Sequence, residues 1–227
     1  MEMLGRLPHG NARIGYNDRM NATATRQTLL ENGATMNRQE FHRLYEQCDG
    51  LRKVELIEGV VYMPSPEKVE EHSRQQGMLF HWLRSYQELH EGEVEAVPGG
   101  SVYLDDENEP IPDGMIYRLR PDRFIDGYID GAPDLVIEIA NSSVSRDLHQ
   151  KMEAYRRNGV EEYIVWRVRN GAIDWFQLRG GQYVQRTPDA LGIIESEQFP
   201  GLRLDVAAAL AMNLKQVLAV VRAAPAH

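Results

Sequence analysis

The six residues Leu135–Ala140 constrain the fold of this chain more than any other segment. They read Leu-Val-Ile-Glu-Ile-Ala, so the run is apolar apart from Glu138. A short apolar run of this kind is typical of a strand that is covered on both faces of a sheet. A carboxylate inside such a strand is strongly destabilising unless it is paired, hydrogen-bonded or bound to a metal. The segment therefore predicts a layered fold around a buried central strand, with a special role for Glu138.

Composition limits the class of protein. A chain of 227 residues with 42% hydrophobic and 26% charged residues fits one globular domain. Its single cysteine, Cys48, excludes an intrachain disulfide and a zinc site made of several cysteines. No apolar run approaches the roughly 18 residues that cross a bilayer, and the N-terminus lacks a leader-peptide pattern, so we expect a cytoplasmic protein without membrane association. The formal charge of −9 argues against a protein that coats nucleic acid nonspecifically, although local charge can differ.

Hydrophobic periodicity and turn residues divide the chain into helices and strands. Residues 1–34 show no periodicity and are predicted to be a flexible N-terminal arm. Residues 35–227 are predicted to be a single α/β (α+β) domain with a mixed central β-sheet flanked by helices. We expect helices at 39–47, 65–90, 142–158 and 204–221, a hairpin over 54–63 with its turn at Glu58-Gly59, a loop at 121–132, and strands at 93–97, 102–104, 111–117, 135–140, 163–168, 172–178 and 183–186.

Strand geometry decides which aspartate can act together with Glu138. Asp134 lies four residues earlier on the same strand, so about 13 Å separates the two positions at roughly 3.3 Å per residue. Such a pair cannot share a cation whose oxygen ligands lie at about 2.1 Å, and we interpret Asp134 as a strand-start or loop-cap residue. Asp113, in Pro112-Asp113, belongs to the preceding predicted strand, and neighbouring strands are only about 4.8 Å apart. We therefore predict that Asp113 and Glu138 bind one Mg²⁺, for which Mn²⁺ can substitute. The alternative of a structural ion pair between Glu138 and an arginine stays open.

Asp147, Lys151 and Tyr155 recur at four-residue intervals on the predicted helix that follows the Glu138 strand. They share one helix face, and the short connection allows that face to lie over the carboxyl end of the strand. Lys151 would there stabilise negative charge, and Asp147 is spaced to orient its amine. The alternative is a solvent-exposed face held by salt bridges.

The predicted helix at 65–90 carries an apolar stripe that becomes polar at its early end, at His72 and Gln76. Such a change indicates that this end of the helix borders a site. A satisfied histidine at the edge of the core is the alternative interpretation.

Taken together and in this order, these segments resemble the PD-(D/E)XK nuclease superfamily and, more narrowly, the restriction endonuclease family called Uma-two. The matching segments are 54–59, His72, Pro112-Asp113, 135–139, Asp147 with Lys151 and Tyr155, and 159–163. The resemblance covers roughly residues 38–210. It implies the restriction-endonuclease-like fold, magnesium-dependent cleavage of DNA and, by analogy, a homodimer.

The resemblance also implies roles for individual residues. Asp113 and Glu138 would be metal ligands and Lys151 the catalytic lysine, with His72, Tyr155 and either Glu55 or Glu58 completing the site. In the strict superfamily pattern the lysine stands two residues after the acid, where this chain has Ala140, so Lys151 must reach the site from the helix. Two alternatives remain: an inactive relative that binds nucleic acid or protein, and a structural homodimer in which Glu138 pairs with an arginine.

Overall fold

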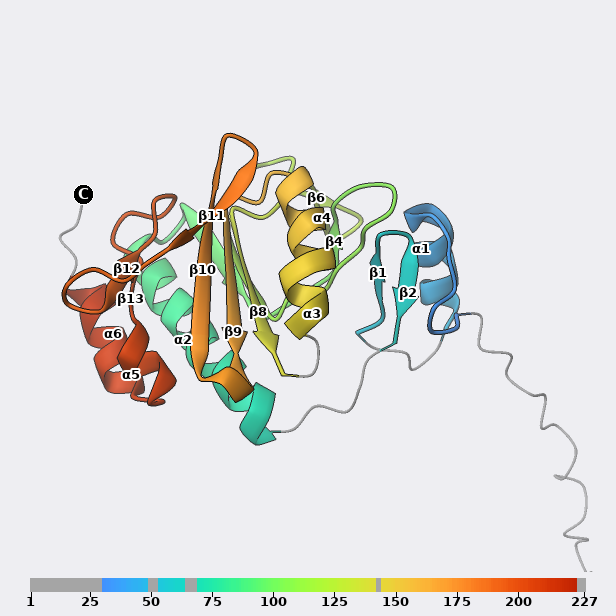
Figure 1. Ribbon diagram of the computed structural model, residues 1–227. Helices are drawn as coiled ribbons and strands as arrows, with labels where there is room; N and C mark the ends of the chain where they lie inside the picture. Colours follow the sequence, from blue (N-terminus) through green and yellow to red (C-terminus); the bar gives the residue numbers. More distant parts are fainter. Residues whose placement is uncertain (1–29, 49–52, 64–68, 142–143, 224–227) are drawn as a thin grey trace, which may run out of the picture.

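The computed structural model describes residues 30–48, 53–63, 69–141 and 144–223, and it confirms the predicted α/β class (Figure 1). A six-stranded sheet has the order β11-β10-β9-β8-β5-β3. Its strands are β3 (Val94–Val97), β5 (Gly114–Arg118), β8 (Leu135–Ala140), β9 (Glu162–Arg167), β10 (Ala172–Arg179) and β11 (Gln182–Arg186). Strands β8 and β9 are parallel and the other neighbouring pairs are antiparallel, so the sheet is mixed as predicted.

Strand β8 has the predicted bounds, and all six of its residues are buried. Because side chains alternate along a strand, Leu135, Ile137 and Ile139 face one side of the sheet. Val136, Glu138 and Ala140 face the other side. Burial on both faces explains why the segment is a continuous apolar run.

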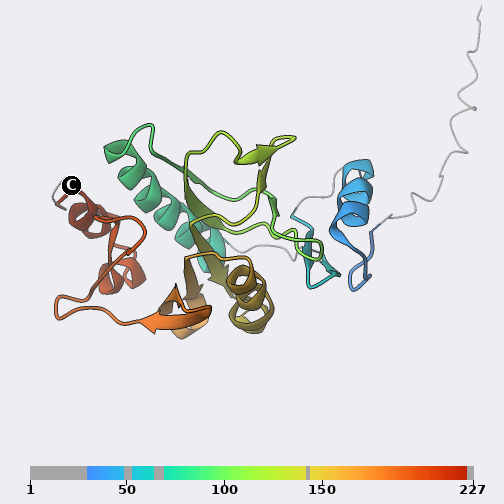
Figure 2. The same ribbon diagram turned by 90° about the horizontal axis from the view of Figure 1, so that it is seen from above.

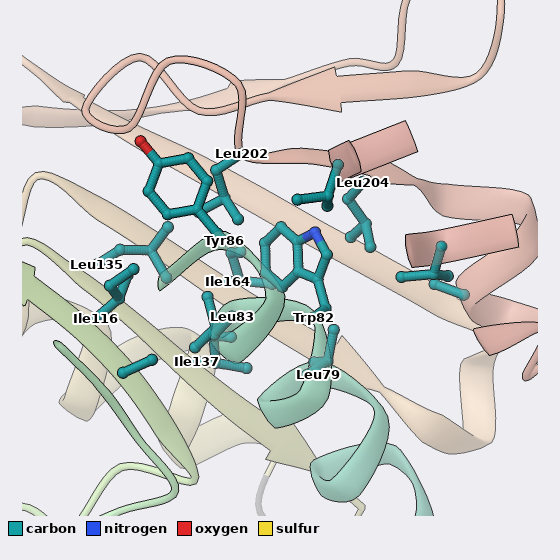
Figure 3. Packing of buried hydrophobic residues seen from close by; sticks show 14 of the residues in the cluster. Leu79, Trp82, Leu83, Tyr86, Ile116, Leu135, Ile137, Ile164, Leu202 and Leu204 are labelled. Atoms are coloured by element: carbon teal, nitrogen blue, oxygen red, sulfur yellow. The ribbon is translucent and has the colours of Figure 1, made fainter. Parts of the chain in front are cut away.

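One face of the sheet is covered by α2 (Arg74–Leu89), α5 (Val206–Leu210) and α6 (Leu214–Arg222) (Figures 1 and 2). Figure 3 shows the apolar packing there, with the Trp82 ring on α2 close to Leu204 and Ile164. The Trp82 indole N–H donates to the carbonyl oxygen of Arg203 at 2.8 Å, so the polar atom of this buried ring is satisfied.

The other face is covered by one helical segment made of α3 (Val144–Arg146), the π-helical turn η2 (Asp147–Lys151) and α4 (Met152–Arg157). Gly159, with φ of +79°, follows the end of α4, as expected for a helix stop. Tyr155, Val160, Tyr163 and Val165 fill the space between this segment and the sheet.

The N-terminal part of the described chain forms a small unit with its own apolar cluster. It consists of α1 (Arg38–Gln47) and the hairpin β1 (Glu55–Ile57) and β2 (Val60–Tyr62). The buried residues of its apolar cluster are Leu30, Phe41, Val54, Leu56 and Val61. The predicted hairpin is confirmed, because Glu58 (φ +51°) and Gly59 (φ +70°) both adopt the left-handed conformation of a tight turn.

The predicted flexible arm is only partly described, since residues 1–29 lie outside the described residues. Residues 30–34 belong to the folded unit, contrary to the prediction: Leu30 is buried, and the Gly33 N–H donates to the Val61 carbonyl at 2.8 Å. Backbone pairing to β2 orders this stretch although its sequence shows no periodicity.

The predicted C-terminal helix over 204–221 is wrong. This region holds β13 (Arg203–Asp205), paired with β12 (Ile193–Glu195), and then the separate helices α5 and α6. Met212 has φ of +56° and the Asn213 side chain caps α6, so the chain turns between the two helices. Residues with high helix propensity on both sides conceal this break in the sequence.

Two further segments differ from the predictions, and a third is only partly described. The predicted loop at 121–132 contains β6 (Phe124–Ile125) and β7 (Tyr128–Asp130), which join β4 (Val102–Tyr103) in a small sheet. Strand β5 begins at Gly114 and not at 111. The predicted helix start at 65–68 lies outside the described residues, and the helix is described from the π-helical turn η1 (Val69–Ser73) onward. None of the helices in the described ranges combines the length and hydropathy of a membrane span.

Candidate active site

Asp113 and Glu138 face each other across two hydrogen-bonded strands. The register of β5 and β8 pairs Gly114 with Ile137, so its continuation by one residue places Asp113 opposite Glu138. The Asp113 carboxylate accepts a hydrogen bond from the Ile139 backbone N–H at 2.8 Å, which holds it against β8. Opposite residues in an antiparallel pair have Cα atoms only about 4.5–5.5 Å apart. The two side chains therefore leave neighbouring positions on the same face of the sheet.

Glu138 is bound by the helix that covers its face of the sheet. Its Oε1 accepts hydrogen bonds from the Lys151 Nζ and from the Tyr155 hydroxyl, each at 2.9 Å. Glu138 and Lys151 are each 3% exposed, and Tyr155 is fully buried. The solvent-exposed alternative for this helix face is therefore wrong. Lys151 reaches the acid from the helix even though Ala140 occupies the usual lysine position.

Of the two candidate glutamates, the structure brings Glu55 into the cluster and leaves Glu58 outside it. The Glu55 Oε1 lies 2.7 Å from the Lys151 Nζ and accepts from the Ile111 N–H at 2.8 Å. Glu58 sits in the turn of the hairpin and pairs with Arg157 at 2.9 Å. Its inclusion among the predicted site residues is therefore corrected.

His72 and Gln76 approach Asp113 from the other side, as the polar end of their helix predicts. The His72 Nε2 lies 3.1 Å from the Asp113 Oδ1. The Gln76 side-chain amide donates to the Asp113 backbone carbonyl at 2.9 Å. Asp134 is structural, since Arg118 and Arg123 bind its carboxylate at the start of β8.

Sequence reasoning missed a polar link beside the site. The Asn141 side-chain amide donates to the Glu71 Oε2 at 2.6 Å, and Arg169 pairs with the same oxygen at 3.2 Å. Asn141 directly follows β8, and Glu71 directly precedes His72. A polar residue at the carboxyl end of a central strand is the signal that could have identified Asn141.

The cluster is electrostatically unbalanced, because four carboxylates surround the Lys151 ammonium: Glu55, Asp113, Glu138 and Asp147. Burial raises the pKa of Glu138 well above its usual range; the Lys151 charge opposes this shift, and the neighbouring carboxylates add to it. For Lys151, burial works against the charged form, but Glu138, Glu55 and Asp147 outweigh it and raise its pKa. Lys151 therefore stays protonated and positively charged. Whether Glu138 is ionised depends on the balance between its burial, the Lys151 charge and the neighbouring carboxylates.

Asp113 shows the opposite shift. Burial acts to raise its pKa, but the hydrogen bond and charge of His72, the Ile139 N–H and the Lys151 charge together lower it. Asp113 thus stays ionised more readily than Glu138.

The donor set suits a hard divalent cation. Carboxylate oxygens are the ligands that Mg²⁺ prefers, and the surplus of buried negative charge favours a cation. Among the described residues, no group of three or more His, Cys, Asp and Glu side chains forms a ready set of ligands. Asp113 and Glu138 are the two carboxylates of this cluster that would hold such an ion.

Comparisons with known proteins agree with this architecture. Residues 38–207 match the model of the Uma2 (Uma-two) family, described as "Putative restriction endonuclease". A crystal structure of a "putative nuclease belonging to DUF820" from Anabaena variabilis is similar with a TM-score of 0.61 and 16% sequence identity, over 78% of this chain and 98% of that one. At that identity the likeness shows the fold, and it confirms the predicted mixed sheet flanked by helices. No curated protein sequence matches the chain.

The family match spans about three quarters of the chain and includes all of the predicted site residues, so it confirms the resemblance drawn from their order and spacing. This chain belongs to the Uma2 family of restriction endonuclease-like proteins.

Proposed function

We propose that the protein is a metal-dependent endonuclease that hydrolyses phosphodiester bonds in DNA. The observation that carries the proposal is the placement of Asp113 opposite Glu138, with Lys151 bonded to Glu138. Two acids and a lysine that converge from two strands and a helix are the parts that such a hydrolysis needs. Membership of a family described as nucleases, and the fold shared with a protein described as a nuclease, support the choice of nucleic acid as substrate.

Asp113 and Glu138 would hold Mg²⁺, for which Mn²⁺ can substitute. When bound, this ion supplies a Lewis acid for a phosphate oxygen and lowers the pKa of a coordinated water. Asp113 is suited to the ligand role because it stays ionised, and its carboxylate is fixed by the Ile139 N–H.

Lys151 would act as a fixed positive charge. Its raised pKa excludes it as a general base near neutral pH, so its role is to stabilise negative charge that develops on the phosphate. Tyr155 donates to the same oxygen of Glu138 and holds that carboxylate in one orientation. His72, which contacts Asp113, would accept or deliver a proton at the site.

The experiment that tests the proposal uses supercoiled, linear and single-stranded DNA with Mg²⁺, Mn²⁺ or EDTA. We expect cleavage by the wild type only with a metal, and its loss in Asp113→Asn and Glu138→Gln. Asp130→Asn is the matched control, because it removes an exposed acid on β7. Undiminished cutting by either site variant would reject the assignment of these two acids.

A second candidate function is an inactive nuclease-fold protein that binds nucleic acid or protein. The observation that favours it is the double ion pair of Lys151, which already compensates Glu55 and Glu138. Thermal melting in millimolar Mn²⁺ separates the two candidates. A rise in Tm that requires Glu138 supports the metal site, whereas DNA binding without any Tm response to metal supports the binding module.

Two expectations from the sequence remain proposals. We propose a homodimer by analogy with the family, to be tested by the mass of the protein in solution. A cytoplasmic location is proposed on the single cysteine, to be tested by cell fractionation.

A further inference from the structure

Arg146 is a basic side chain at the edge of the acidic cluster, and no carboxylate among the described residues pairs with it. Its guanidinium carbon lies 4.8 Å from the centre of the Tyr62 ring. Within the described part of the chain it forms no ion pair, and its Nε is buried without a hydrogen-bond acceptor. By contrast, Arg157 is bonded to Glu58 and Arg169 to Glu71. Among the described residues, the Tyr62 ring is therefore the contact that holds the Arg146 charge, and no acid there compensates it.

The hairpin β1–β2 places this arginine beside Lys151. Tyr62 is the cross-strand partner of Glu55, so both side chains leave the same face of the hairpin. Glu55 contacts Lys151, whereas the Tyr62 ring packs against the Arg146 guanidinium. The Tyr62 hydroxyl donates to the Gln150 Oε1 at 3.1 Å. Arg146 and Lys151 thus lie at one junction between the helical segment and the hairpin.

A positive charge at this place would offset the repulsion between the acidic cluster and a polyanion. A polyanion that approaches Glu55, Asp113 and Glu138 is repelled, and Lys151 is already compensated by two of these acids. A guanidinium group binds phosphate oxygens in a forked, two-point geometry and also stacks on aromatic rings. The Arg146 Nε–H has no acceptor among the described residues. A phosphate oxygen could therefore accept the hydrogen bond that is missing there.

We propose that Arg146, supported by the Tyr62 ring, binds a backbone phosphate of nucleic acid and so holds the strand against the acidic cluster. The identity of the ligand rests on the proposed function. The assignment concerns substrate binding, which distinguishes it from the roles of Asp113, Glu138 and Lys151.

The test measures binding of a fluorescent DNA duplex by anisotropy, in EDTA so that no cleavage occurs, over a range of salt concentrations. Arg146→Gln should weaken binding about tenfold and reduce the slope of log Kd against log salt by about one, since one phosphate contact is lost. Arg222→Gln makes the same change of charge on α6, on the other face of the sheet, and should alter neither quantity. Tyr62→Phe keeps the ring and should bind normally, whereas Tyr62→Leu should fall between the wild type and Arg146→Gln.

The outcomes separate this inference from the proposed function. If the wild type cuts DNA while Arg146→Gln keeps its affinity and salt slope, the inference is overturned and the nuclease proposal stands. If binding depends on Arg146 but no metal supports cleavage, the inference stands and the nuclease proposal fails. Absence of DNA binding by the folded wild type at the lowest salt overturns the inference, and far-UV circular dichroism checks that each variant is folded.

Discussion

Glu138 and Glu162 lie on the neighbouring parallel strands β8 and β9, and both are buried, yet their surroundings differ completely. Glu162 accepts hydrogen bonds from the Ser196 hydroxyl and the Glu197 N–H, both at 2.7 Å. These donors are neutral and come from one loop. Glu138 is bound by a charged lysine and a tyrosine, with further carboxylates close by.

Burial is the first cause that raises the pKa of both glutamates, so burial alone does not identify a reactive acid. Glu162 faces the same side of the sheet as Ile164, where α2 and α6 pack, and it fastens a loop to the core. Glu138 faces the opposite side, where it lies near other carboxylates. A cation could neutralise the negative charge of this group. The charged neighbours, and not the depth, distinguish the candidate site from a structural carboxylate.

Replacement of each glutamate by glutamine tests the difference between the two sites most directly. Glu138→Gln should reduce metal-dependent cleavage by at least about a hundredfold, because a proposed metal ligand is lost. Glu162→Gln should leave cleavage within about twofold of the wild type but cost about 1–3 kcal/mol of stability, because its amide cannot accept both loop bonds. Cleavage rates and urea denaturation measure the two effects, and equal loss of cleavage in both variants would contradict the distinction.

Removal of the Lys151 charge tests whether this lysine stabilises the buried Glu138 carboxylate. Lys151→Met should destabilise the protein by about 3–5 kcal/mol, because Glu138 and Glu55 are left as uncompensated buried acids. The double variant Lys151→Met with Glu138→Gln should recover part of this loss, measured by urea denaturation. Strictly additive losses would show that the two side chains are not coupled.

The pH dependence of metal binding should come from Glu138 and not from Glu162. The folded-state pKa of Glu138 is raised, so its proton is kept to higher pH than in the unfolded chain, and the stability from protonation is lost as pH rises through that pKa. A cation competes with this proton, so the Tm increase in Mn²⁺ should grow as pH rises from the usual glutamate range near 4.5 toward the raised pKa. Below the raised pKa, apparent metal affinity should fall about tenfold per pH unit.

Melting curves at fixed Mn²⁺ across this range measure the effect. Glu162→Gln is the control that should keep the pH dependence, although burial raises the pKa of Glu162 as well. A metal response that does not change with pH would contradict proton competition at Glu138.

The smallest expected effect comes from matched removal of one hydroxyl donor from each glutamate. Tyr155→Phe and Ser196→Ala should each cost about 1–2 kcal/mol in thermal melts, because each leaves a buried carboxylate with one donor fewer. Only Tyr155→Phe should also lower the cleavage rate, by severalfold, since it frees Glu138 to rotate. A similar loss of cleavage in Ser196→Ala would remove the contrast between the two sites.

The central strand and the pairing of its acid could be predicted because both depend on local regularities. A continuous apolar run fixed β8, and the spacing between strands selected Asp113 over Asp134, in agreement with the register that places Asp113 opposite Glu138. Helical spacing likewise predicted that Lys151 and Tyr155 share a face, and the structure brings both to Glu138.

The remainder depends on contacts between distant segments, which spacing does not reveal. The choice of Glu55 over Glu58 requires knowledge of how the hairpin docks on the helix. The roles of Glu162 and of Asn141 depend on loops that return from elsewhere in the chain. The break between α5 and α6 depends on the left-handed Met212, in a stretch whose composition favours an uninterrupted helix.

Lys151 is held by two parts of the molecule with separate apolar cores, because Glu138 belongs to the sheet and Glu55 to the small N-terminal unit. The double restraint on the ammonium group therefore requires that the small unit stay packed in its present place. A substitution at Leu56 or Phe41, remote from any reacting atom, would thus act as a partial loss of the lysine. A change in the hairpin would thereby alter the restraint on Lys151 without altering a residue of the sheet.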